Sequence, residues 1–244
     1  MANLKPKLIV ALDVETFEEA RVLIDTLSSA VDIFKVGSQL FTSCGPVVVR
    51  FIEARQKEVF LDLKYHDIPN TVANAVQAAV KALTAGRISG QGDKSILMYT
   101  MHIAGGEEML ARALEAAQKT AQETGLRRPL SLGITVLTSE GSGDNIQLLV
   151  LKRALLAKKV GLDGVVASVQ EAPMIRKECG SDFIIVTPGI RPLDADVGDQ
   201  KRVATPSLAV QSGSHYLVVG RPIVKAKNPL SAAQEILKEI ASIT

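Results

Sequence analysis

The chain has 244 residues, of which 47% are hydrophobic, so it can bury a sizeable core at a length that single α/β barrels commonly reach. Its 28 Lys and Arg residues against 26 Asp and Glu residues leave a net charge of +2, which is too small for a nucleic-acid-binding surface. The sequence has no segment typical of a membrane span or a signal peptide, and its two cysteines lack metal-ligand spacing, so we expect a cytoplasmic protein that binds neither nucleic acid nor membrane.

Short β-prone apolar runs alternate with longer stretches of helical spacing from Leu8 onward. Eight such runs occur, and a helix candidate follows each of them. The predicted strands cover residues 8–13, 33–37, 59–64, 96–102, 130–138, 164–168, 183–189 and 216–220. The predicted helices cover residues 17–28, 39–56, 72–85, 107–123, 146–160, 171–178, 207–211 and 230–241.

The predicted strands are continuously apolar rather than alternating, which indicates burial on both faces. Eight such strands with intervening helices predict an α/β fold, a closed (β/α)8 TIM barrel, with an open doubly wound sheet as the alternative. No Ser- or Pro-rich linker divides the chain, so we expect residues 1–244 to form one domain. The polar segment 86–94 is predicted to be an exposed loop before the fourth strand.

A charged stretch follows the third predicted strand. Asp62 and Lys64 end this strand and lie on one face of it, because side chains alternate along a strand. Asp67 lies in the next turn, and Thr71 is a candidate N-cap for the helix that follows. A lysine between two carboxylates keeps its proton, since both neighbours favour the ammonium form, so Lys64 is predicted to be a positioned acid. Taken by itself, this motif is equally consistent with a salt-bridged strand end.

Polar residues gather at the predicted carboxyl ends of the strands, which build the catalytic face of such barrels. They are Asp13, Lys35, Asp62, Lys64, His102, Thr138, Ser139, Arg191 and Arg221. Any one of them could be an ordinary polar residue at a strand end. So many on one rim predict a functional site.

The loops after the seventh and eighth strands resemble a phosphate site, which is the usual position for one in these barrels. Gly220 allows the backbone to approach a ligand, and the guanidinium of Arg221 suits phosphate oxygens. Arg191 precedes the long polar segment 193–202, which we expect to close over a ligand as a lid, although a solvated loop is the alternative. The spacing of the three histidines indicates no metal site.

Seven motifs together resemble the orotidine 5'-phosphate decarboxylase family, in the family's order and over almost the whole chain. They are Ala11-Leu12-Asp13, Lys35-Val36-Gly37, the ten residues from Asp62 to Thr71, Leu137-Thr138-Ser139, Thr187-Pro188-Gly189-Ile190-Arg191, Asp199-Gln200-Lys201-Arg202 and Gly220-Arg221-Pro222-Ile223. The segment 86–94 is longer than the form typical of the family.

The resemblance implies a homodimer that converts orotidine 5'-monophosphate (OMP) to UMP and CO2, the last step of de novo UMP synthesis, with neither metal nor organic cofactor. It implies that Lys64 donates the proton to C6 within a charge array of Lys35, Asp62, Lys64 and Asp67. Asp67, Ile68 and Thr71 would reach into the neighbouring subunit's site. The other implied substrate contacts are Asp13 and Lys35 at the ribose, Thr138 and Ser139 at the pyrimidine, and Arg191, Gln200, Gly220 and Arg221 at the phosphate and lid.

Three other activities fit parts of the same pattern. A Mg²⁺-dependent sugar-phosphate decarboxylase or aldolase of the same superfamily shares Asp-x-Lys-x-x-Asp, but the residues from His66 to Thr71 and the Asp199-Gln200 pair favour the nucleotide enzyme. A Schiff-base aldolase would need a neutral Lys35 or Lys64, which flanking carboxylates oppose. A non-catalytic phosphate-binding barrel would bind UMP and leave OMP unchanged.

Overall fold

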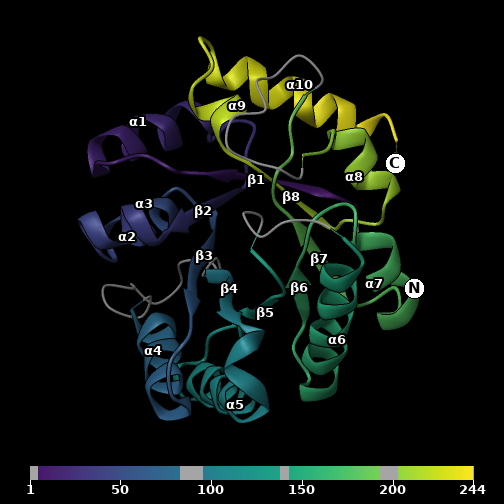
Figure 1. Ribbon diagram of the computed structural model, residues 1–244. Helices are drawn as coiled ribbons and strands as arrows, with labels where there is room; N and C mark the ends of the chain where they lie inside the picture. Colours follow the sequence, from purple (N-terminus) through teal and green to yellow (C-terminus); the bar gives the residue numbers. More distant parts are fainter. Residues whose placement is uncertain (1–4, 83–95, 138–142, 193–202, 244) are drawn as a thin grey trace.

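The computed structural model describes residues 5–82, 96–137, 143–192 and 203–243. Within these ranges, eight parallel strands form a closed barrel in sequence order (Figure 1). The strands are β1 (Lys7–Ala11), β2 (Ile33–Gly37), β3 (Glu58–Tyr65), β4 (Ile96–His102), β5 (Leu130–Ile134), β6 (Gly164–Val166), β7 (Ile184–Thr187) and β8 (Tyr216–Val219). Strand β8 pairs with β1, which closes the barrel.

Helices surround the barrel on its outside (Figure 1). They are α1 (Phe17–Leu27), α2 (Ser38–Cys44), α3 (Val47–Ala54), α4 (Pro69–Lys81), the 3₁₀ turn η1 (Ile103–Gly105), α5 (Gly106–Thr124), α6 (Asp144–Val160), α7 (Ala172–Cys179), α8 (Pro206–Gln211), α9 (Arg221–Val224) and α10 (Pro229–Ala241). The predicted (β/α)8 TIM barrel is confirmed, and the alternative of an open sheet is wrong. In the part of the chain that is described, no helix is both long and apolar enough to span a membrane.

One predicted helix is two in the structure. Residues 39–56 were expected to form a single helix, but α2 ends at Cys44 and α3 begins at Val47. Gly45 adopts a positive φ of 61°, a conformation that glycine reaches without a steric penalty and that ends a helix. Pro46 follows and has no N–H to continue the hydrogen-bond ladder, so the break is built into these two residues.

The helix after the charged stretch begins earlier than predicted. Pro69 is the first residue of α4 and Ile68 is its N-cap, so the prediction that Thr71 caps this helix is wrong. Proline is favoured at a first helical position, because its fixed φ suits the helix and the N–H that it lacks would have no partner there. Thr71 therefore lies in the first turn of α4, and its side chain is exposed.

The hydrophobic core has two layers. The larger cluster lies between the sheet and the helices, whereas a smaller one fills the barrel interior with side chains such as Ile33, Phe60 and Met98. Side chains alternate along a strand, so a residue two positions further on points the same way. Lys35 follows Ile33 by this spacing, and Thr100 follows Met98. The polar layer therefore lies directly above an apolar floor, at the carboxyl ends of the strands.

Candidate active site

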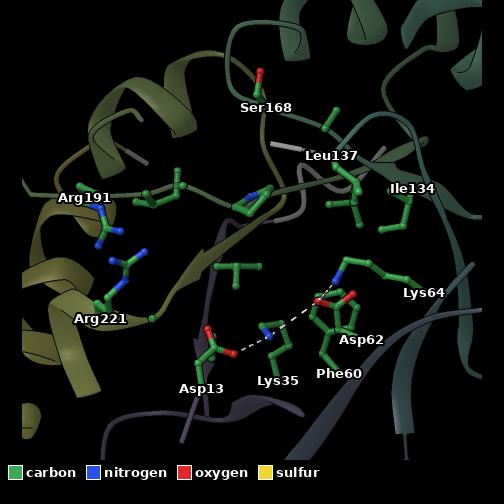
Figure 2. A pocket seen from close by; sticks show the side chains of 18 of the residues that line it. Asp13, Lys35, Phe60, Asp62, Lys64, Ile134, Leu137, Ser168, Arg191 and Arg221 are labelled. Carbon is green, nitrogen blue, oxygen red and sulfur yellow. Dashed lines mark hydrogen bonds and ion pairs between the residues drawn. The ribbon is translucent and has the colours of Figure 1, made fainter. Parts of the chain in front are cut away.

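A cavity of about 220 Å³ opens at the carboxyl ends of the strands (Figure 2). Every strand except β4 contributes to its wall, directly or through the loop that follows. The lining residues are Ala11, Asp13, Lys35, Phe60, Asp62, Lys64, Ile134, Val136, Leu137, Val166, Ala167, Ser168, Pro188, Gly189, Ile190, Arg191, Val218, Gly220 and Arg221. The predicted convergence of strand-end polar residues is therefore present for Asp13, Lys35, Asp62, Lys64, Arg191 and Arg221, whereas His102 does not line the cavity. Gly220, a predicted phosphate contact, lines it as well.

Four of these side chains form a chain of alternating charge (Figure 2). The Nζ of Lys35 lies 3.0 Å from Oδ1 of Asp13 and 3.6 Å from Oδ2 of Asp62. The same Oδ2 of Asp62 accepts a hydrogen bond of 2.7 Å from Nζ of Lys64. One carboxylate thus lies between two ammonium groups, which fixes the positions of both.

Asp62 is the more buried of the two carboxylates in this array, with only 11% of its side chain exposed. Burial by itself would raise its pKa, but the charges of Lys35 and Lys64, together with hydrogen bonds from Lys64 and Thr100, hold the pKa below its ordinary value. Asp62 is therefore an anion at neutral pH. A second carboxylate placed beside it would be repelled.

The backbone around Lys64 is irregular. Lys64 has a positive φ of 52°, which is uncommon for a residue with a side chain. The pairing of β3 with β4 changes register here, since Leu61 pairs with Tyr99 and Tyr65 with Met101. Asp62 and Lys64 both line the cavity as predicted, but a bulge, rather than regular alternation, places Lys64 there.

The opposite end of the cavity is cationic. Arg191 is buried at 7% exposure, whereas Arg221 at the start of α9 is exposed, and Figure 2 shows both guanidinium groups at the same end. The backbone N–H of Arg191 donates to the carbonyl of Ala204 at 2.9 Å, so these two residues, which come before and after residues 193–202 in the sequence, are neighbours. A Cβ on Gly220 would come within 3.3 Å of Oδ2 of Asp13, so a side chain at this position would crowd the Asp13 carboxylate at the edge of the cavity. Two guanidinium groups at one end suit a dianion such as phosphate.

The wall between the charged ends is largely apolar, and sequence reasoning did not identify its residues. Ile134, Val136 and Val166 contribute to it, as do Phe60 and Leu137. Their positions at or just beyond the ends of strands indicate that they lie near the rim. In the sequence, however, an apolar residue that lines a cavity looks the same as one that is buried in the core. A cavity with an apolar wall, a cationic end and a charge array suits a flat ring that carries a phosphate.

Ser168 is a polar lining residue that sequence reasoning also missed. It follows β6 closely, which is the signal that could have identified it. Its backbone N–H donates to Oε2 of the buried Glu171 at 2.8 Å, and its hydroxyl donates to the same oxygen. This pair fixes the loop between β6 and α7 at the edge of the cavity.

Asp67, Ile68 and Thr71, which were predicted to be site residues, also lie outside the cavity. Asp67, Ile68 and Thr71 are exposed, with Ile68 at 66%, and Oδ1 of Asp67 accepts the backbone N–H of Ile68 at 2.7 Å. Within the described ranges Lys64 forms its ion pair with Asp62 rather than with Asp67. The prediction from the residues that Lys64 lies between two carboxylates is therefore not met inside one chain. Asp67 accordingly does not line the cavity.

Some predictions concern residues that the structure does not describe. Thr138, Ser139 and Gln200 lie outside the described residues, as do the segments 86–94 and 193–202. Their roles stay predictions.

The two histidines near the barrel mouth are closer than their spacing in the sequence suggests. The ring centroids of His66 and His102 are 5.3 Å apart, because β3 and β4 are neighbours. Among the residues with a described position, no group of three or more His, Cys, Asp and Glu side chains could hold a metal ion.

Known proteins resemble this chain over nearly its whole length. Residues 6–236 match the family described as "Orotidine 5'-phosphate decarboxylase / HUMPS family". A protein of Geotalea daltonii named orotidine 5'-phosphate decarboxylase is 48% identical over 98% of this chain and 97% of its own. One of the same name from Geobacter sulfurreducens is 47% identical over 97% of this chain and 96% of its own. The crystal structure of orotidine 5'-phosphate decarboxylase from Lactobacillus acidophilus matches with a TM-score of 0.79 and 33% identity, over 97% of this chain and 99% of that one.

These similarities agree with the fold and with the motifs. The family match runs from just before β1 into α10, so it includes all the strands and every described residue of the cavity. The family predicted from the sequence motifs is confirmed by this match and by the curated relatives. This chain belongs to the orotidine 5'-phosphate decarboxylase / HUMPS family.

Proposed function

We infer that this protein is a carboxy-lyase that converts OMP to UMP and CO2, the last step of de novo UMP synthesis. Eight curated relatives, 45% to 48% identical to it, are all named orotidine 5'-phosphate decarboxylase. The observation that carries the inference is a cavity that holds the Asp13–Lys35–Asp62–Lys64 array at one end and two guanidinium groups at the other. The charge array can stabilise the charge that develops at the reacting carbon, and the two arginines can bind the phosphate.

Lys64 is the proposed proton donor. When the bond between C6 and the carboxylate breaks, CO2 leaves and the electron pair stays on C6 as a vinyl carbanion that the ring delocalises poorly. An ammonium group fixed beside C6 stabilises this charge as it develops and then transfers a proton from Nζ to C6. The hydrogen bond of 2.7 Å to Asp62 keeps the ammonium group of Lys64 oriented for this step.

Asp62 is proposed to face the departing carboxylate of the substrate. Because its pKa is held below the ordinary value, Asp62 is an anion next to a second anion when OMP binds. The repulsion disappears as the substrate carboxylate becomes neutral CO2. Asp62 therefore favours the transition state over the bound substrate, and only such a difference accelerates the chemical step.

The remaining contacts are proposed to bind and enclose OMP. Asp13 and Lys35 bind the ribose, Thr138 and Ser139 bind the pyrimidine, and Arg191, Gln200, Gly220 and Arg221 bind the phosphate. Phosphate binding far from C6 supplies the free energy to close segment 193–202 over the site. In this way remote contacts organise the charge array for catalysis.

The alternatives differ from this proposal in the state of the lysines and in their need for a metal. A Schiff-base aldolase needs a neutral amine, whereas Lys35 and Lys64 both form ion pairs with Asp62. A Mg²⁺-dependent sugar-phosphate enzyme needs a metal-binding group, and we propose that the reaction here needs neither metal nor organic cofactor. The names of the similar relatives also favour the nucleotide enzyme over the sugar-phosphate enzyme.

The first prediction is that the purified protein decarboxylates OMP in the presence of EDTA as fast as in its absence, because no step needs a metal. The loss of OMP absorbance measures the rate. Activity that EDTA abolishes and Mg²⁺ restores would instead indicate a metal enzyme. Binding of UMP without any loss of OMP would indicate a phosphate-binding barrel, and covalent trapping of a carbonyl substrate by borohydride would indicate a Schiff-base aldolase.

We also propose that residues 1–244 form one domain, that the protein is cytoplasmic, and that it acts as a homodimer with each site shared between subunits. The exposed Asp67, Ile68 and Thr71 support the shared site. They lie just before α4 or in its first turn, shortly after the strand that carries Lys64, and the large apolar side chain of Ile68 is 66% exposed. In the dimer, Asp67 completes the array beside Lys64 of the other subunit.

The second prediction concerns subunit mixing. Asp67→Asn and Lys64→Ala should each lower the turnover of OMP at least about 10²-fold, because each removes one charge of the array. After the two variants are mixed and their subunits exchange, about a quarter of the sites should carry both native residues and regain activity. Turnover of the mixture against time measures this gain. If Lys64 and Asp67 of one chain form the site, the mixture stays as inactive as its components.

A further inference from the structure

Thr100 is a buried polar residue behind the charge array. It lies in β4 with a relative exposure of 0%, and it is not among the residues that line the cavity. Its hydroxyl donates to Oδ1 of Asp62 at 3.0 Å and accepts the backbone N–H of Lys64 at 2.9 Å. One hydroxyl thus contacts both the central carboxylate and the backbone of the proposed proton donor.

Thr100 also occupies a special place in the sheet. Between the pairs Leu61↔Tyr99 and Tyr65↔Met101, the three residues from Asp62 to Lys64 in β3 face this single residue of β4. A bulge of this kind interrupts the regular ladder, so its backbone groups need other partners. The Thr100 hydroxyl supplies one of them, at the residue whose backbone has a positive φ.

The hydroxyl orients the carboxylate of Asp62 as well. Oδ2 of Asp62 contacts both Nζ of Lys64 and Nζ of Lys35, while Oδ1 accepts from Thr100. With both oxygens in contact, the carboxylate plane cannot rotate without breaking a bond. Without the hydroxyl, the carboxylate of Asp62 can rotate more freely, and the backbone N–H of Lys64 loses its hydrogen bond to β4.

We propose that Thr100 is a positioning residue for the decarboxylation, which holds Asp62 and Lys64 in the relative geometry that the reaction needs. This inference rests on the proposed function of the site. Thr100 acts through these two residues and does not touch the substrate. Removal of the Thr100 hydroxyl should therefore slow the chemical step and change the binding of the nucleotide and its phosphate little.

The experiment compares Thr100→Val, which keeps the shape and removes the hydroxyl, with Thr100→Ser, which keeps the hydroxyl. The valine variant should lower kcat about 10- to 100-fold, since a misplacement of about 1 Å costs on that order. The Kd for UMP should change less than about threefold, because the phosphate contacts remain. The serine variant should retain kcat within about threefold of the wild type.

Thr120→Val is the matched control. Thr120 is also a threonine with 0% exposure, but it lies in α5, and its hydroxyl has no hydrogen-bond partner among the described residues. The same substitution there should leave kcat unchanged. If Thr100→Val does not fold, Thr100→Ala replaces it in the comparison with Thr100→Ser.

The pH dependence of kcat distinguishes a positioning role of Thr100 from a role in stability alone. The hydrogen bond from Thr100 is one of the influences that lower the pKa of Asp62, so its loss should move the acidic limb of the profile to higher pH. Thr100→Ser should leave that limb in place. A normal kcat and pH profile in Thr100→Val, or equal losses in the valine and serine variants, would overturn the inference. A wild-type protein that does not decarboxylate OMP would instead count against the proposed function.

Discussion

Replacement of Lys64 by Ala is expected to lower the turnover of OMP at least about 10⁴-fold. The variant loses the proton donor to C6, which is worth about 10²- to 10⁴-fold, and also the cation that stabilises the developing carbanion, worth about 10²-fold or more. Asp62 keeps its contact with Lys35 at 3.6 Å, so its buried charge is not left without a counter-ion and the barrel should still fold. Steady-state decarboxylation at saturating OMP measures the effect.

Lys57→Ala is the matched control for this variant. Lys57 precedes β3 at the amino end of the barrel, and its Nζ also forms an ion pair, of 2.9 Å, with Asp32. Its removal should leave turnover unchanged, since this pair lies at the end of the barrel away from the cavity. Binding of UMP to Lys64→Ala should persist, which shows that the site is intact. Turnover of Lys64→Ala close to that of the wild type would refute the assignment of Lys64 as the proton donor.

Replacement of Arg221 by Ala is expected to weaken transition-state binding by about 3 to 5 kcal/mol, or roughly 10²- to 10⁴-fold in kcat/KM. A guanidinium can donate two charge-assisted hydrogen bonds to phosphate, and the alanine variant loses both. Guanidinium ion added to the solution should occupy the vacated space and restore part of the activity. The rate of OMP loss at increasing guanidinium concentration measures the rescue.

Two comparisons make the Arg221 prediction specific. Orotidine, which lacks the phosphate, should react equally slowly with the wild type and with Arg221→Ala, because the lost contact does not exist for this substrate. Arg127→Ala removes an arginine that forms an ion pair of 3.1 Å with Glu58 at the other end of the barrel, and it should show neither loss nor rescue. A comparable loss for OMP and orotidine would mean that Arg221 supports the structure of the site and does not bind phosphate.

Much of the fold follows from local sequence patterns. Continuous apolar runs such as residues 8–13 and 216–220 indicate strands that are buried on both faces, and their number predicts a closed barrel. Helix boundaries were less predictable, because Gly45-Pro46 divides one expected helix and Pro69 starts another before Thr71. Glycine and proline act on single backbone angles, which hydrophobic periodicity does not detect.

The candidate site was predictable in part, because the apolar runs also indicate where each strand ends. The position of Asp13, Lys35 and Arg221 at or near strand ends indicated that they would meet, since parallel strands bring their carboxyl ends to one rim. The apolar wall was missed because its residue types carry no signal of chemistry, whereas Ser168 was missed although its position just after β6 was a signal. The proximity of His66 and His102 was missed as well, because it depends on the pairing of β3 with β4.

The sequence by itself determined the barrel, the family and the identity of the charged residues, since these depend on periodicity and on short motifs. Only the tertiary structure decided that Lys64 pairs with Asp62 rather than with Asp67 inside one chain, that β3 bulges between Asp62 and Lys64, and that Thr100 joins these two residues. Thr100 is 38 residues away from Asp62 along the chain. A contact of this kind depends on strand register and bulge geometry, and no local pattern of residues specifies either.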